Sequence, residues 1–166
     1  MTRPYLHYAW EISLYSGKTR AYLRFKGIPF VEKTIRLWTM PTIQKKVGAQ
    51  VMPVVVTPEG EWLQDTSHII DVLEQRFPDA PVVPTTPRQK MVSSLIEAWA
   101  DEYWLPTAMH FRWNFDETNR AFLSRDFPAA LAPTGASDEA QAEVFAMSSG
   151  RTHSSSTLAT ALITRS

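Results

Sequence analysis

Residues 51–57 read Val51-Met52-Pro53-Val54-Val55-Val56-Thr57, and they carry the strongest structural signal in the sequence. The β-branched run from 54 to 57 predicts a strand. Because proline cannot donate to a strand ladder, Pro53 belongs at the first position of that strand. We expect a cis Met52–Pro53 bond, which would turn the backbone N–H and C=O of Met52 outward to pair with an extended peptide ligand. The alternative is an ordinary strand start.

The segments that precede this strand predict a strand–helix–strand unit. Residues 5–10 are rich in aromatic side chains and contain no Gly or Pro, which favours a strand. Residues 18–26 carry apolar side chains at helical spacing before Gly27, and glycine commonly stops a helix. Residues 31–35 have the alternation of a second strand, and such units give parallel strands. A short helix is expected over residues 41–47, since proline is tolerated in a first turn.

The segments that follow predict a hairpin and a helix. Pro58-Glu59-Gly60 is typical of a turn, and residues 61–63 fit a short return strand. Between residues 66 and 77 the apolar side chains fall on one helical face, and Pro78 ends that helix. This order of elements predicts an α/β unit of the form βαβ–ββα, with a mixed four-stranded sheet, over residues 1–80.

The composition changes after residue 80. Residues 81–88 are rich in proline and predict a linker. Residues 89–147 predict a short, partial all-α region, in which Pro106 should kink or restart the first helix. Residues 148–166 are rich in Ser and Thr and predict a poorly ordered or atypical tail. The helical patches of the all-α region are residues 89–104, 118–127 and 137–147.

The bulk composition excludes several kinds of site. Seventeen basic residues balance seventeen acidic ones, so nucleic-acid binding through clustered Lys and Arg is not expected. The absence of cysteine rules out disulfides, thiolate metal sites and dithiol redox chemistry on this chain, and the four histidines lack metal-ligand spacing. No run approaches the roughly 18–20 apolar residues of a membrane-spanning helix, and no signal segment is recognised. A cytoplasmic protein that does not bind membranes is expected.

The order and lengths of the elements carry a family resemblance. A strand, a helix followed by Gly27-Ile28-Pro29, a proline-initiated strand, a hairpin and then Leu-Gln-Asp-Thr-Ser-His-Ile-Ile at residues 63–70 occur in series. This series resembles the N-terminal domain of the glutathione transferase family, over residues 1 to about 115. The resemblance implies a thioredoxin-like fold and glutathione as a substrate, without a metal. Met52 and Pro53 would then bind the cysteinyl backbone of glutathione.

The resemblance also implies a role for the residues that open the third helix. In the family an acidic residue followed by Ser holds the γ-glutamyl end of glutathione, and Asp65-Thr66 stands in that place instead of the usual Glu-Ser. A helix N-terminus offers free N–H groups and a positive dipole end to a carboxylate, and Thr66 adds a hydroxyl. Asp65 would pair with the ammonium group of the ligand. Either residue could instead be only a helix cap.

The chemistry of the family needs a hydroxyl or a thiol beside the sulfur of the ligand. A free thiol, with a pKa of about 8.5, is mostly protonated at neutral pH, so stabilising the thiolate increases the amount of nucleophile. Serine-type members place this Ser seven residues ahead of an Arg, and Ser13 fits that pattern although Leu14 replaces the usual Pro. Tyr8, whose surroundings look like those of tyrosine-type members, is the alternative. Tyr15 and Ser16 are expected to pack and to cap.

An aromatic cluster in the helical region could line the pocket of the second substrate. We expect Trp104, Phe111 and Arg112 in that pocket, with Arg112 in contact with an anionic substrate. The alternative is that aromatic residues at helical spacing form ordinary core.

The resemblance fails beyond residue 115. The helical domain of the family normally continues far past residue 166 and contains a central helix opened by a Ser/Thr-x-x-Asp box, for which no counterpart is found. The apolar faces of residues 89–113 therefore lack their usual partner, and an altered reading frame from about Ser148 is one hypothesis. The sequence thus predicts a glutathione transferase-like protein that activates glutathione for attack on a small electrophile, in detoxification and as a homodimer. A non-catalytic binding or interaction protein with the same fold is the alternative.

Overall fold

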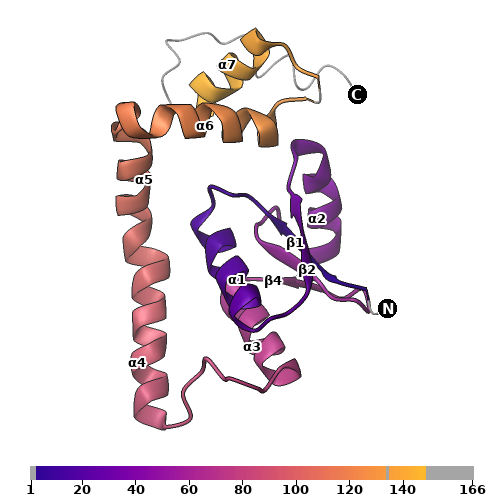
Figure 1. Ribbon diagram of the computed structural model, residues 1–166, viewed down its shortest axis with the longest axis vertical. Coiled ribbons are helices and arrows are strands. Elements are labelled where there is room, and N and C mark those ends of the chain that lie inside the picture. The colour runs from indigo at the N-terminus through magenta and orange to yellow at the C-terminus, as the bar shows by residue number, and fades with distance from the viewer. Residues whose placement is uncertain (1–2, 134, 149–166) are drawn as a thin grey trace.

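The structure is a computed structural model, which describes residues 3–133 and 135–148 (Figure 1). Its N-terminal part contains a four-stranded sheet in the order β2-β1-β3-β4. β2 is parallel to β1, whereas β3 and β4 are antiparallel to their neighbours. The expected mixed sheet is therefore confirmed. The strands are β1 (Tyr5–Ala9), β2 (Phe30–Thr34), β3 (Val54–Val56) and β4 (Trp62–Gln64).

Helices cover both faces of this sheet. On one face α1 and α3 pack around an apolar cluster that includes Val55, and on the other α2 packs around a cluster that includes Val54. Because successive strand residues point to opposite faces, β3 supplies both cores, which explains why all of its residues are apolar. The helices are α1 (Leu14–Phe25), α2 (Met40–Val47), which follows the 3₁₀ turn η1 (Leu37–Thr39), and α3 (Thr66–Arg76).

α1 begins at Leu14, ahead of the expected start at residue 18. Ser13 caps this helix, since its Oγ accepts a hydrogen bond of 3.2 Å from the N–H of Ser16. Gly17 lies in the first turn, and its low helix propensity hides that turn from a search for helical patterns. At the other end Gly27 has a φ of 63°, a left-handed conformation that glycine adopts without strain.

The helical part begins with a long continuous rod, which lies along the left of Figure 1. Its first helix starts at Pro87, inside the expected linker, because Thr86 Oγ1 accepts a hydrogen bond from the N–H of Gln89 and proline suits the first turn. The rod consists of α4 (Pro87–Ala98), the π-helical turn η2 (Trp99–Tyr103) and α5 (Trp104–Asn114). It is followed by α6 (Asp116–Leu131), which crosses the end of the rod, and α7 (Asp138–Ser148), which packs on α6 (Figure 1).

Pro106 was expected to kink or restart the helix, and it does not restart it. The chain instead accommodates this proline with the widened turn η2 immediately before α5, and the rod continues (Figure 1). The reason is that Pro106 has no N–H to donate to the carbonyl of Glu102, four residues earlier. A π-helical turn rearranges the hydrogen bonds around such a position.

A third apolar cluster attaches the helical part to the sheet domain. It joins Ile12, in the loop after β1, to Phe127 of α6 and Phe145 of α7. Trp113 packs on Phe127 with ring centroids 5.0 Å apart. The apolar side of residues 89–113 was expected to lack its usual partner, and at Trp113 α6 and α7 supply apolar contacts in its place.

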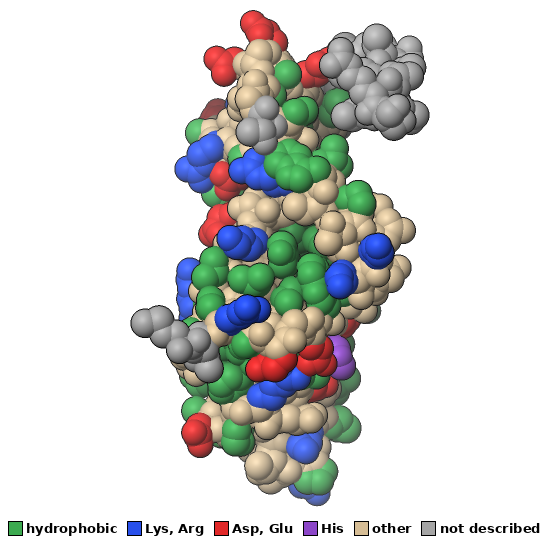
Figure 2. Space-filling view, turned by 90° about the vertical axis from the view of Figure 1, so that its right-hand side faces the viewer, with side chains coloured by type: hydrophobic (Ala, Val, Ile, Leu, Met, Phe, Trp, Pro, Cys, Tyr) green, Lys and Arg blue, Asp and Glu red, His purple; other side chains and the backbone are tan. Residues whose placement is uncertain are grey.

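The right-hand face of the molecule carries α2 and is shown in Figure 2. Hydrophobic side chains gather in the middle of this face, and Lys and Arg lie on several sides of them. Within the described residues, no helix has the length and apolar character needed to cross a membrane. The predicted tail lies outside the described residues, apart from Ser148, which ends α7.

Candidate functional site

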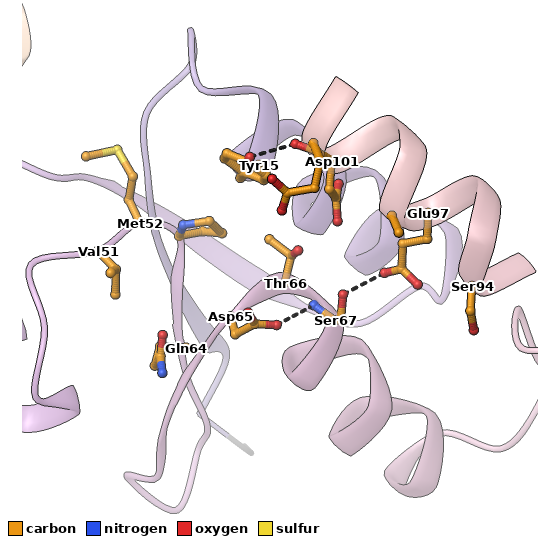
Figure 3. Close-up of a pocket in the computed structure, with 13 residues that line it drawn as sticks. Tyr15, Val51, Met52, Gln64, Asp65, Thr66, Ser67, Ser94, Glu97 and Asp101 are labelled. Atoms are coloured by element: carbon orange, nitrogen blue, oxygen red, sulfur yellow. Dashed lines mark hydrogen bonds between the residues drawn. The ribbon is translucent and has the colours of Figure 1, made fainter. Parts of the chain in front are cut away.

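A cavity of about 450 Å³ opens between the sheet domain and the α4–η2 part of the rod (Figure 3). Ligand pockets in proteins commonly have volumes of roughly 300–1,000 Å³. Four segments line the cavity: the first turn of α1, the loop before β3, the junction of β4 and α3, and the inner side of the rod. The lining residues are Tyr15, Val51, Met52, Pro53, Gln64, Asp65, Thr66, Ser67, Ser94, Glu97, Ala98, Asp101 and Glu102.

The loop before β3 contributes Met52 and Pro53. The peptide bond between them is cis, so the conformation predicted from the sequence is confirmed. Pro53 is buried at the start of β3, whereas Met52 is partly exposed and lines the cavity. The start of β3 therefore places this loop on the cavity wall.

Asp65 and Thr66 lie together at the N-terminus of α3, on the cavity wall. Asp65 caps the helix, since its Oδ1 accepts hydrogen bonds from the N–H groups of Ser67 at 3.0 Å and His68 at 3.1 Å. The capping role considered for this residue is thus observed, and it occupies only one of the two carboxylate oxygens. Thr66 is 7% exposed, with its side chain at the cavity.

The backbone of Asp65 is unusual. Its φ of 71° with ψ of 124° lies outside the regions that side chains favour, and among the described residues Ala80 is the only other non-glycine with positive φ. Such a conformation costs on the order of 1–3 kcal/mol and typically persists where function requires it. The strain turns the Asp65 side chain toward the first turn of α3 and the adjoining cavity (Figure 3).

The rod gives the cavity an acidic wall. Glu97, Asp101 and Glu102 line it, opposite Asp65. Lys18 of α1 lies beside this wall and donates hydrogen bonds of 2.6 Å to the carboxylates of both Glu97 and Asp101. Burial opposes the charge of Lys18, but the bonds to the two carboxylates outweigh it and raise the pKa of this lysine. Lys18 is therefore charged at neutral pH.

Tyr15 also lines the cavity, and its hydroxyl donates a 2.8 Å hydrogen bond to the carbonyl of Asp101. Burial, together with the neighbouring charges of Glu102 and Asp101, raises the pKa of the Tyr15 phenol, so it stays protonated. The sequence-based interpretation assigned Tyr15 to packing and did not single out Lys18. The available signal was weak. Tyr15 and Lys18 are three residues apart and so share one side of their helix, and Glu97 and Asp101 are four apart and share a side of theirs.

The two candidates for the thiolate stabiliser lie elsewhere. Ser13 caps α1, and Tyr8 stacks on Trp62 with ring centroids 5.5 Å apart. Neither side chain is part of the lining of the cavity. Of the residues near the start of α1, Tyr15 is the one that the fold places on the cavity wall.

The residues expected in the pocket of the second substrate lie on α5. Trp104 and Phe111 are 46% and 55% exposed, and neither lines the cavity. Arg112 is half-buried and donates a hydrogen bond to the carbonyl of Ile12, so it contacts the loop that precedes α1. Burial lowers the pKa of Arg112. In the part of the chain that the structure describes, no group of three or more His, Asp or Glu is arranged to hold a metal.

The comparison with protein families agrees with this geometry. Residues 8–81 match the family model of the glutathione S-transferase N-terminal domain. This part of the chain is similar to a glutathione S-transferase N-terminal domain. The match includes the Met52–Pro53 loop and the start of α3, which are two of the four segments of the cavity wall. A search of curated protein sequences found no match.

Solved transferase structures share the fold of the chain. A glutathione S-transferase from Methylobacterium radiotolerans, in complex with glutathione sulfonate, is 23% identical with a TM-score of 0.57, over 90% of this chain and 64% of the other. One from Methylobacillus flagellatus, with glutathione bound, is 22% identical with a TM-score of 0.53, over 89% and 65%. One from Rhodospirillum rubrum is 15% identical with a TM-score of 0.58, over 87% and 61%. The chain thus spans less than two thirds of the length of each.

Proposed function

We propose that the chain binds glutathione in the cavity and activates its thiolate for attack on a small electrophile. The observation that carries this proposal is that Met52–Pro53 and Asp65–Thr66, both in the part of the chain that matches the transferase N-terminal domain, line one cavity. Two similar structures hold glutathione sulfonate or glutathione. The cavity volume of about 450 Å³ suits a ligand of that size.

Each end of the ligand has a partner in this arrangement. The backbone of Met52 pairs with the cysteinyl residue of glutathione, as in strand addition. The ammonium of the γ-glutamyl group binds the second oxygen of Asp65, which the helix cap leaves available. The carboxylate of the same γ-glutamyl group accepts a hydrogen bond from the hydroxyl of Thr66, at the positive end of the α3 dipole.

The reaction that we propose is a nucleophilic substitution or addition. The thiolate sulfur forms a bond to an electrophilic carbon, and in a substitution the leaving group departs with the electron pair of the bond that breaks. A hydroxyl that donates to the sulfur favours the thiolate over the thiol. Ser13 is the proposed donor and Tyr8 the alternative, and Trp104, Phe111 and Arg112 are proposed to contact the electrophile. No metal takes part in this proposal.

A non-catalytic glutathione-binding protein is the second candidate. The observation in its favour is that neither Ser13 nor Tyr8 lines the cavity. The Tyr15 hydroxyl, which is at the cavity, is engaged with the carbonyl of Asp101.

Calorimetry with glutathione, followed by turnover of a chloro-nitroaromatic electrophile, separates the two candidates. We expect saturable binding of glutathione, which is the minimum that the proposal requires, and formation of the thioether. Binding without turnover would favour the non-catalytic candidate. If the full chain binds no glutathione at millimolar concentration, the assignment of the cavity is wrong.

We further propose that the chain is a cytoplasmic homodimer that associates through α4 and η2. The residues concerned are Met91, Leu95, Trp99 and Tyr103, which are 62%, 61%, 51% and 75% exposed. Side chains of this size expose about 100–200 Å² each at such fractions, so this face with its neighbours approaches the roughly 800 Å² per partner of a standard interface. We therefore propose a second copy of this chain as the partner that covers this face.

A further inference from the structure

The wall that α4 and η2 form is not attached to the sheet domain by an apolar core. Two apolar clusters of the described residues lie within the sheet domain, and the third joins the loop after β1 to α5, α6 and α7. None of the three clusters includes a described residue of α4 or η2. Apart from its continuity with α5, this wall therefore depends on contacts of another kind for its position against α1 and α3.

Polar contacts join the wall to α1 and α3. Lys18 Nζ donates to Glu97 Oε1 and to Asp101 Oδ2, both at 2.6 Å, and lies 3.4 Å from Ser67 Oγ. The Ser67 hydroxyl donates to Glu97 at 2.7 Å, and the Tyr15 hydroxyl donates to the backbone carbonyl of Asp101 at 2.8 Å (Figure 3). We call these five residues the α1–rod latch.

Two cavities share residues of the latch. Glu97 and Asp101 line the glutathione cavity, and both also line a second cavity of about 370 Å³, whose lining includes Lys18. The second cavity is mainly apolar, with Ile70, Val83 and Ile96 among its lining residues. Two cavities therefore adjoin the latch, and no described residue of α4 or η2 joins an apolar cluster beside it.

The environment of the latch makes its ion pairs stronger than those of an open surface. The side chains of Lys18 and Asp101 are each 21% exposed, and that of Glu97 is 37% exposed. Partly buried charges are less screened by salt than exposed ones. Removing one partner of such a group leaves the remaining charges unpaired, which costs more than the pair contributes. Lys18 is the cation that both carboxylates share.

We propose that Lys18 is a positioning residue of the glutathione cavity. Its ammonium, together with the Tyr15 hydroxyl, holds α4 and η2 at the separation from α1 and α3 that the ligand requires. Lys18 acts through Glu97 and Asp101 and does not itself line the cavity. The identity of the ligand rests on the proposed function, whereas the position of the rod does not.

The first experiment measures glutathione affinity by calorimetry in three variants. Lys18→Met should weaken binding about tenfold or more, because the wall loses its attachment and the cavity gains uncompensated negative charge. Lys18→Arg, which keeps the cation, should restore most of the affinity. Lys90→Met is the control, since it removes a charge from an exposed site on α4, and it should bind like the parent protein. Equal affinity in Lys18→Met and the control would overturn the proposal.

The second experiment tests the rod without any ligand. The chain has no cysteine, so two spin labels can be placed at Arg24→Cys on α1 and Lys90→Cys on α4, both exposed positions outside the proposed dimer face. With Lys18 intact, the distance between the labels should have a narrow distribution, and Lys18→Met should broaden it. An unchanged distribution would overturn the proposal. If the parent protein fails to bind glutathione but Lys18→Met still broadens the distance distribution, the proposed function is wrong. The role of Lys18 in positioning the rod would then still hold.

Discussion

Asp65 combines a structural role with a proposed binding role in a single side chain. One oxygen caps α3, and the backbone is held at positive φ. A change to Ala removes the cap as well as the charge, and a lost cap alone costs about 1 kcal/mol. A change to Asn keeps an oxygen that can cap and removes only the charge. The pair of variants therefore separates stability from binding.

We predict that Asp65→Asn and the double variant Asp65→Ala, Thr66→Ala both weaken glutathione binding. Losing a hydrogen bond to a charged group is worth about 1.5–3 kcal/mol, hence about tenfold or more in affinity by calorimetry. Asp71→Ala, an exposed acid on the same helix, is the control. Unchanged glutathione affinity in Asp65→Asn would show that Asp65 only caps α3 and does not bind the ligand.

Ser13 and Tyr8 are distinguished by the titration of bound glutathione. If Ser13 donates to the sulfur, Ser13→Ala should raise the pKa of the bound thiol, because the hydroxyl favours the thiolate, while the affinity stays nearly the same. The ultraviolet absorbance of the thiolate against pH measures this. Ser13→Gly provides a check, since glycine is better tolerated than Ala as a cap. A shift seen only in Tyr8→Phe would assign the role to Tyr8.

His7 should make the fold sensitive to acid. It is fully buried between Thr19 and Glu32, and this burial lowers its pKa despite the hydrogen bond to Glu32. The unfolded chain therefore binds a proton more readily than the folded one. Stability is complete above the ordinary histidine pKa of about 6.5 and falls as the pH drops from there through the folded value.

Urea unfolding at pH 7.5 and pH 5.5 checks this prediction. The free energy of unfolding should be lower at pH 5.5, and His7→Gln should flatten the difference between the two conditions. His68→Gln, at an exposed position on α3, should leave the difference as it is. Equal pH dependence in the parent protein and His7→Gln would show that another group is responsible.

At the level of elements, α1 offers a matched pair of glycines. Gly27 follows the helix at a φ of 63°, whereas Gly17 lies within it, and an added Cβ would meet nothing within 4 Å at either position. Gly27→Ala should destabilise the protein by about 1–2 kcal/mol, because alanine is strained in that conformation. Gly17→Ala should stabilise it by about 0.5–1 kcal/mol, because alanine favours the helix. Thermal unfolding measures both, and the same sign for both variants would contradict the explanation.

The elements that the sequence predicted well are those with a strong local signal. The apolar run of β3, the proline before it and the periodic face of α3 identify the sheet domain and half of the cavity wall. The start of α1 was not predicted, because Gly17 obscures its first turn. The π-helical turn η2 was not predicted either, since it depends on how the helix accommodates Pro106. The roles of Tyr15 and Lys18 were missed for another reason: both side chains contact the rod, and no local sequence pattern encodes the position of the rod.

At the level of the whole molecule, we predict a dimer. The exposed face of α4 and η2 is large enough for one, and light scattering should give a mass above that of a single chain, 18.9 kDa. Met91→Gln with Leu95→Gln should lower the mass toward that of the monomer, because both changes remove apolar area from this face. Val31→Gln, on β2, is the control at an exposed apolar position elsewhere. A monomeric parent protein at high concentration would contradict the prediction.

The wall that carries Glu97 and Asp101 is shared by two cavities, which has a thermodynamic consequence. Because the same two side chains line both cavities, a molecule that fills the apolar cavity and displaces this wall must change the affinity for glutathione. Linkage requires the effect to be reciprocal, so glutathione changes the affinity for that molecule by the same factor. An apolar compound of suitable size would thus act as a modulator from outside the glutathione cavity. The size of its effect on glutathione affinity would be set by the difference between its affinities for the protein with the wall in place and with the wall displaced.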